Sequence, residues 1–450
     1  MKRLLSFFSV AFGLFALAVL RDTPAEAVPS YARQTGLACN GCHTTPPELN
    51  GAGRRFKLLG YTDRGDDTAT VSNEAGKKHA GLDLLKSLPV SAMFDASFTA
   101  VKTPEPDSKS TTFQFPQDVS LFLAGGWSSH VGSFIQITYS TQDDHFAIDN
   151  TDIRFADKTT LGGKELVWGL TLNNNPTVED LWNTTPAWGF PWIGSDWAPT
   201  PAAAPLLAGA LAQDVAGLGA YAMWNEHLYV AAAIYATNHV GSSQPNTGAS
   251  FPTNISGVAP YWRVAWQQSL DADNTLEVGT YGIQVNSTPN GISGLRNGYT
   301  DWGFDLQYDR TVFVRDVVSV RVTYIRETST LDATYDQGGA TQAADNIGMF
   351  RANVGYHFGN VFSVTAGLQD VIGTSDPLLW TAAPVTGSAN GSPNSLSYLV
   401  NLSWWPIQNV QIAAQYTAYT CFNGSKTNYD GSGRNAGDNN TIYLLARFIF

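Results

Sequence analysis

From Leu88 to the C-terminus this sequence alternates apolar and polar residues at period two, in segments of about ten residues separated by Gly, Asn, Asp, Ser and Pro clusters. Strict alternation predicts β-strands with one apolar and one polar face. The first segment shows it: Val90, Ala92, Phe94, Ala96 and Phe98 share one face, and Ser91, Asp95, Ser97 and Thr99 share the other. Similar stripes include Leu166/Trp168/Leu170/Leu172, Trp302/Phe304/Leu306/Tyr308, Val318/Val320/Val322/Tyr324 and Val410/Ile412/Ala414/Tyr416. The segments number about 16, an even count in the range of transmembrane β-barrels.

A soluble β-sandwich also alternates, so the lengths of the connections decide between the two. Short candidate turns lie near Asn225, Asp273, Gly359 and Gln408. Between them lie long connections, at 174–212, 239–258, 287–298, 328–345, 373–393 and 421–439. Short turns alternating with long loops are typical of outer-membrane barrels, whose short turns face the periplasm. We therefore predict a mainly β fold, a roughly 16-stranded antiparallel transmembrane barrel over residues 89–450.

Composition and both ends of the chain agree with an outer-membrane location. Charged residues are 14% and aromatic residues 12% of the chain, whereas soluble domains contain about 25% charged residues. Lys2 and Arg3 precede an apolar run, and Ala25-Glu26-Ala27 supplies a cleavage site, so residues 1–27 read as a signal peptide. Beyond residue 28 no stretch approaches the roughly 18 apolar residues of a spanning helix. The terminal Phe450 resembles the assembly signal of bacterial outer-membrane proteins.

Cys39-Asn40-Gly41-Cys42-His43 matches the C-x-x-C-H pattern by which c-type haem is attached. Two thiols add to the two porphyrin vinyl groups, and the next residue places an imidazole beneath the iron. A zinc site would need further ligands, and the remaining cysteine, Cys421, is remote and carries no assigned role. A redox-active C-x-x-C would be expected near a βαβ pattern, and none follows. We predict one covalently bound haem c, held by Cys39, Cys42 and His43.

Residues 28–88 are short for an independent cytochrome domain, so this helical haem segment is expected to need the barrel as a packing partner. Pro46 and Pro47 stand where a helix could begin, and Leu49, Ala52, Phe56 and Leu59 follow at helical spacing. Arg54 and Arg55 are candidate contacts for the haem propionates. A solvated basic face is an equally good interpretation of these two arginines.

A longer stretch carries a resemblance. Tyr31-Ala32-Arg33-Gln34-Thr35-Gly36-Leu37-Ala38-Cys39, with Cys42-His43, Gly53-Arg54-Arg55-Phe56-Lys57 and Gly60-Tyr61-Thr62, resembles the porin-fused monohaem cytochromes c of iron-oxidising bacteria. The barrel resembles that family in length, strand pattern and terminus. The resemblance implies a haem in or under the pore. It also implies an electron path from extracellular Fe(II) to a periplasmic carrier, a cytochrome or a copper protein.

The second haem ligand is best sought on the lumen face of the first strand. Alternation places Met93 there among Ser91, Asp95 and Ser97, near the periplasmic end. Met–His ligation raises the haem potential, which electron withdrawal from iron requires. His79 is the rival candidate, and Met223 and His357 also fall on lumen positions.

Three functions follow as hypotheses. The first is an outer-membrane cytochrome that acts as an Fe(II):cytochrome c oxidoreductase, with lumen-facing Asp95, Glu277, Asp305 and Asp309 attracting the dication. The second is a diffusion porin whose haem segment only plugs or gates the pore. The third is electron uptake from another extracellular donor. The net charge of −12 argues against a nucleic-acid partner.

Overall fold

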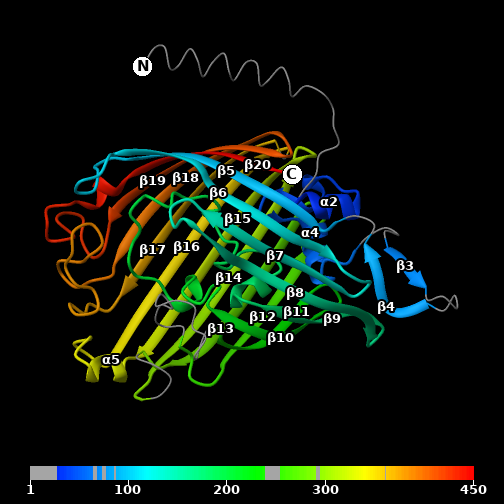
Figure 1. Cartoon of the computed structure of the whole chain (residues 1–450), viewed down its shortest axis with the longest axis horizontal. Coiled ribbons are helices and arrows are strands. Elements are labelled where there is room, and N and C mark those ends of the chain that lie inside the picture. Colours follow the sequence, from blue (N-terminus) through cyan, green and yellow to red (C-terminus); the bar gives the residue numbers. More distant parts are fainter. Residues whose placement is uncertain are drawn as a thin grey trace, which may run out of the picture.

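The computed structural model describes residues 28–63, 68–72, 78–85, 88–238, 254–289, 294–359 and 361–450, with backbone only for 68–72 and 78–85. The predicted signal peptide, 1–27, lies outside these residues. Sixteen antiparallel strands, β5 to β20, form one closed barrel (Figure 1). The last strand pairs with the first, Thr441 opposite Val101, so the sheet has no free edge. The predicted fold class is confirmed.

The barrel strands follow the chain order: β5 (Val90–Val101), β6 (Thr111–Gly126), β7 (Val131–Ser140), β8 (His145–Leu161), β9 (Lys164–Asn173), β10 (Val215–Trp224), β11 (Leu228–Thr237), β12 (Ala259–Ser269), β13 (Asn274–Ser287), β14 (Asn297–Val312), β15 (Asp316–Thr330), β16 (Ala344–Phe358), β17 (Phe362–Gly373), β18 (Ser395–Ile407), β19 (Val410–Cys421) and β20 (Thr441–Ile449). Among the described residues, no helix is long and apolar enough to cross a membrane.

Alternation along each strand separates an apolar outer face from a mixed inner face. In β5, Ser91, Asp95 and Ser97 are buried and face the lumen, as predicted. In β9, Trp168, Leu170 and Leu172 are exposed on the outside of the wall. An exposed apolar band around a closed barrel is the surface that a bilayer covers.

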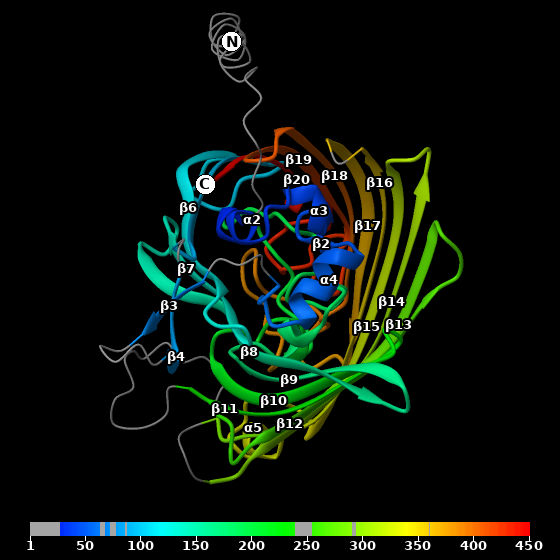
Figure 2. The ribbon, with the colours of Figure 1, turned by 90° about the vertical axis from the view of Figure 1, so that its right-hand side faces the viewer.

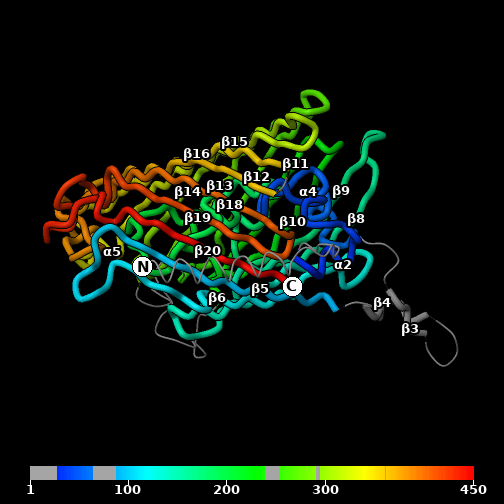
Figure 3. The backbone as a smooth tube through the Cα atoms, turned by 90° about the horizontal axis from the view of Figure 1, so that it is seen from above, coloured from blue at the N-terminus to red at the C-terminus, as the bar shows by residue number. Residues whose placement is uncertain are grey.

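The connections at the two ends of the barrel differ in length, as predicted. One end, here called the short-turn end, carries the tight turns between β8 and β9, β10 and β11, β14 and β15, and β18 and β19. The other end carries the longer connections, with α5 (Asp332–Asp336) and η3 (Ala436–Asn439); the four-residue connection 141–144 is an exception. The N-terminal helices lie at the short-turn end, opposite the outer loops (Figure 3).

The N-terminal segment consists of short elements seated in the mouth of the barrel (Figure 2). They are α2 (Pro29–Thr35), α3 (Cys39–Cys42), β1 (His43–Thr45), β2 (Glu48–Leu49) and α4 (Gly51–Leu58), followed by a separate hairpin of β3 (Thr68–Ser72) and β4 (Lys78–Leu85). The helix expected at Pro46 and Pro47 begins instead at Gly51, because these prolines form the turn between β1 and β2. Asn50 caps it, its side-chain oxygen accepting a hydrogen bond from the Gly53 N–H at 3.1 Å.

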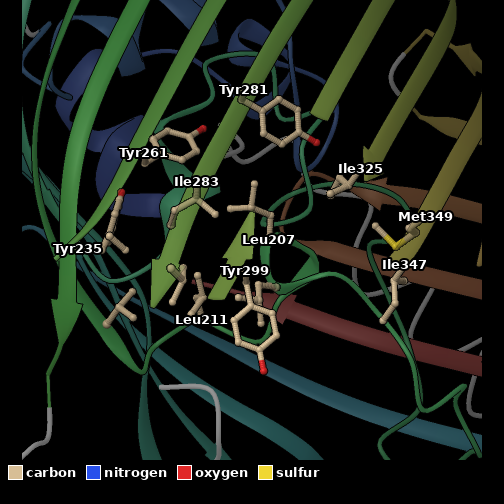
Figure 4. Packing of buried hydrophobic residues seen from close by; sticks show 14 of the residues in the cluster. Leu207, Leu211, Tyr235, Tyr261, Tyr281, Ile283, Tyr299, Ile325, Ile347 and Met349 are labelled. Atoms are coloured by element: carbon tan, nitrogen blue, oxygen red, sulfur yellow. The ribbon is translucent and has the colours of Figure 1, made fainter. Parts of the chain in front are cut away.

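One long connection does not stay outside. Residues 174–214, between β9 and β10, fold into the lumen with η1 (Pro176–Glu179) and η2 (Leu206–Ala208) and are here called the inward loop. Leu206, Leu207 and Leu211 join a buried cluster with Tyr235, Tyr261 and Tyr281 of the wall (Figure 4). The prediction of an external loop was wrong for this connection, because its apolar side chains find their partners on the inner wall.

Candidate functional site

The C-x-x-C-H motif lies between the barrel rim and helix α4. The Cys39 N–H donates to Oε1 of Gln408, in the tight turn between β18 and β19, at 2.7 Å. The Cys42 carbonyl is so close to α4 that a Cβ on Gly53 would lie 2.2 Å from its oxygen. Only glycine permits this approach. The motif is therefore positioned by both the barrel and the segment's own helix.

Beside the motif lies a cavity of about 420 Å³. Cys39, Cys42 and His43 line one side, and Met93 of β5 contributes from the barrel wall. Most other lining side chains are apolar or aromatic, among them Tyr31, Leu37, Phe56, Phe122, Phe134, Trp188, Trp192 and Trp405. Cofactor pockets are typically apolar cavities of roughly 300–1,000 Å³ with a few placed polar groups. The residues that line this cavity thus fit a flat apolar porphyrin attached through two thiols.

His43 has the protonation state that iron ligation needs. Burial lowers the pKa of its imidazole to about 4, outweighing the opposing backbone hydrogen bonds to Glu48 and Pro47. At any higher pH the ring is neutral and keeps a lone pair for a metal. Burial and the nearby Asp63 also raise the pKa of the Cys42 thiol, which is uncharged at neutral pH.

The candidates for the second haem ligand lie in different parts of the structure. Met93 lines the same cavity as His43. Met223 is buried in another cluster, with Leu58 and Trp182. His357 is buried beside Ser319, with its Nε2 2.9 Å from Oγ. The side chain of the remaining rival, His79 in β4, lies outside the described residues. Among the described candidates, Met93 alone shares the cavity, and its role as ligand stays a prediction.

The two arginines proposed as propionate contacts have other partners. Arg55 forms ion pairs with Glu165 at 3.0 Å and Glu226 at 3.1 Å, both near tight turns of the barrel. Arg54 is buried, donates to the Leu49 carbonyl and lies 3.7 Å from Asp309. Both line a smaller pocket on the other side of α4, with Met223. Both arginines attach α4 to the barrel wall and neither lines the cavity beside the C-x-x-C-H motif, so this placement does not support them as propionate contacts.

The four lumen carboxylates expected to attract a dication are also neutralised. Asp95 pairs with Arg447 at 2.7 Å, and Asp309 lies near Arg54 and Arg321. Asp305 and Glu277 both pair with Arg263, at 2.7 and 3.3 Å. All four face the lumen as predicted, yet none is a free negative charge. In the part of the chain that the structure describes, no group of three or more His, Cys, Asp or Glu side chains forms a metal site.

Buried polar contacts that we did not predict hold the N-terminal segment in the barrel. Glu48 of β2 pairs with Arg321 of β15 at 2.7 Å, and neither side chain is more than 3% exposed. The Lys57 ammonium donates to the Asp180 carbonyl of the inward loop at 2.6 Å, and the Tyr61 hydroxyl donates to Asp152 of β8 at 2.6 Å. One signal was available: Glu48 is the single acidic residue between Val28 and Thr62. An isolated charge in a segment that must pack on a barrel indicates a buried partner.

Comparison with solved structures finds outer-membrane channels. OmpF of Salmonella typhi, in complex with daunomycin, is 11% identical, with a TM-score of 0.48, over 80% of this chain and 97% of its own. An anion-selective porin from Comamonas acidovorans is 10% identical, with a TM-score of 0.45, over 81% and 99%. The channel DcaP of Acinetobacter baumannii is 11% identical, with a TM-score of 0.44, over 80% and 96%. Likeness of this extent says nothing about what the barrel binds or conducts. No protein-family model matches the sequence, and no curated protein matches it as a relative.

Proposed function

We propose that this chain is an outer-membrane c-type cytochrome that takes electrons from extracellular Fe(II) and delivers them to a periplasmic carrier protein, a cytochrome or a copper protein. The observation that carries the proposal is one apolar cavity lined by Cys39, Cys42 and His43 on one side and by Met93 on the barrel wall. Cys39 and Cys42 would hold the haem covalently, and His43 and Met93 would ligate its iron. Haem with imidazole and thioether ligands supplies one-electron chemistry at a high potential.

The buried attachment of the haem segment favours a fixed plug over a movable gate. Releasing it would expose or leave unpaired Glu48, Arg54 and Lys57, which all have partners in the wall or the inward loop. Removing one partner of a buried ion pair costs about 3–5 kcal/mol. The segment is therefore expected to hold the cavity at a fixed distance from the short-turn end. Electron transfer to a docked carrier requires such a fixed distance.

The short-turn end is the proposed docking side for that carrier. The predicted signal peptide and the short turns at this end support a periplasmic location for it, because outer-membrane barrels carry their short turns on that side. Near the cavity, Leu37 and Asn40 are exposed at this end, and Leu37 also lines the cavity. An apolar group at the edge of a redox site lets a partner approach without a large desolvation cost.

A diffusion porin with a haem-bearing plug is the second candidate. The closed sixteen-stranded barrel with a connection folded into its lumen is the architecture of a diffusion channel. A third candidate is uptake from a donor other than Fe(II), because the four lumen carboxylates expected to attract iron each lie beside an arginine.

Two measurements on protein from a haem-competent host separate the candidates. The wild-type chain should be red, with one covalent haem by pyridine haemochrome assay, and Cys39→Ala should not retain a wild-type level of covalent haem with a normal c-type spectrum. Anaerobic Fe(II) should reduce the wild-type haem in stopped-flow spectra at acid pH. A covalent haem that Fe(II) leaves oxidised, in a chain that conducts ions across planar bilayers, would support the porin instead.

A further inference from the structure

One wall of the cavity carries a buried cation without an anionic partner. Lys57 of α4 lines the cavity, and its ammonium donates to two neutral oxygens, the Asp180 carbonyl at 2.6 Å and Oδ1 of Asn183 at 3.2 Å. In the described part of the chain no carboxylate forms an ion pair with it. Burial, reinforced by Arg154 and only partly offset by the charges of Asp152 and Asp180, lowers its pKa to about 7. An anion placed beside a buried ammonium would stabilise its charged form.

The other cations near the cavity are already satisfied. Arg447 also lines the cavity, but Asp95 pairs with it at 2.7 Å. Arg55, two residues before Lys57 on the same helix, pairs with Glu165 and Glu226 away from the cavity. Lys57 is therefore the cation at the cavity that still requires a counter-charge.

Unsatisfied hydrogen-bond donors surround the same cavity. The indole N–H of Trp188 is buried and meets no acceptor among the described residues; its ring lies 5.8 Å from the Lys57 ammonium. The indoles of Trp192 and Trp405 are in the same state and also line the cavity, while a fourth, Trp380, lies elsewhere. Other indoles do have acceptors: Trp182 donates to Gln267. Buried donors are nearly always paired in folded proteins, so the cavity lacks an acceptor.

A wall with one ammonium that forms no ion pair, and with indole N–H donors that meet no acceptor, matches a carboxylate, which is anionic and only accepts hydrogen bonds. We propose that Lys57, together with the indole N–H of Trp188, binds a propionate carboxylate of the haem attached at Cys39 and Cys42. The inference rests on the proposed function and assigns to Lys57 the role expected of Arg54 and Arg55. Asn183 positions the Lys57 side chain: its Oδ1 accepts a hydrogen bond from the Lys57 ammonium, and its amide N–H donates to the Pro47 carbonyl at 2.9 Å.

The test compares matched variants of the haem-loaded protein. Lys57→Met removes the charge, Lys57→Gln keeps a donor without charge, and Trp188→Phe removes the indole N–H. Arg55→Met and Trp197→Phe are the controls, because neither residue lines the cavity. Heat-modifiable migration on gels verifies that each variant has a folded barrel.

The readouts are the propionate bending band in resonance Raman spectra and the midpoint potential from spectroelectrochemistry. Both Lys57 variants should shift the band and lower the potential, because an unpaired propionate charge stabilises ferric haem. Trp188→Phe should shift the band, and the two controls should change neither quantity. Lys57 variants that match Arg55→Met in band and potential would overturn the assignment while leaving the cytochrome function intact. A wild-type chain without covalent haem would overturn both.

Discussion

Arg263 of β12 offers the sharpest test of how the inward loop is held. Its side chain is fully buried and contacts three carboxylates: Asp305 at 2.7 Å, Asp180 of the inward loop at 3.0 Å and Glu277 at 3.3 Å. Arg263→Met keeps a long side chain but removes the charge that these carboxylates share. They would then repel one another in a buried site.

The structure sets the size of the expected effect. Removing one partner of a buried ion pair costs about 3–5 kcal/mol, whereas an exposed pair is worth only about 0–1 kcal/mol. Arg55, whose side chain is 36% exposed, supplies the exposed comparison. At about 1.36 kcal/mol per tenfold, Arg263→Met should raise the open population of the inward loop roughly a hundredfold to several thousandfold. Arg55→Met should change it less than tenfold.

Hydrogen exchange with mass spectrometry measures that population. The Trp182, Thr184 and Thr185 amides donate to the Asp180 carboxylate at 2.9, 2.8 and 3.0 Å, so their exchange reports release of the loop. Exchange should accelerate strongly in Arg263→Met, and less in the milder variant Asp180→Asn. Rates in Arg263→Met no faster than in Arg55→Met would refute the buried network as the anchor of the loop.

Three further outcomes are expected. Met93→His should keep a low-spin haem but lower its midpoint potential and abolish reduction by Fe(II) at acid pH, whereas Met349→Leu in the wall should change neither; an unchanged potential in Met93→His would return the choice to His79, Met223 or His357. A chain lacking residues 28–88 behind its signal peptide should still reach the outer membrane as a heat-modifiable barrel, because the closing pair of β20 and β5 lies beyond this segment; loss of assembly would contradict it. In protein produced without haem attachment, the Lys57 ammonium has a pKa of about 7 when folded and 10.5 when unfolded, so between these values the unfolded chain binds the extra proton. Stability to urea should rise across that pH window, and Lys57→Met should flatten the rise; equal slopes would count against a buried Lys57.

The barrel was predictable because its signals are local. Period-two alternation predicts which face of each strand contacts lipid. Turn residues, as near Asn225 and Gln408, indicate where the chain reverses direction. The C-x-x-C-H pattern was equally local, since Cys39, Cys42 and His43 lie within five residues, and it led to the prediction of haem attachment. Alternation even placed Met93 on the lumen face, where it lines the cavity.

What the sequence could not determine is which distant groups neutralise one another. Thr184 and Asp305 are 121 residues apart and hydrogen-bond inside the lumen, so nothing local showed that residues 174–214 would fold inward. Arg54, Arg55 and Lys57 are basic residues within four positions of one short helix, and the sequence alone does not tell their partners apart. Only the tertiary structure shows that Arg54 and Arg55 pair with carboxylates of the barrel wall, whereas Lys57 at the cavity contacts neutral oxygens. The reason is that strands far away in the chain determine how deeply each residue is buried and which charges lie beside it.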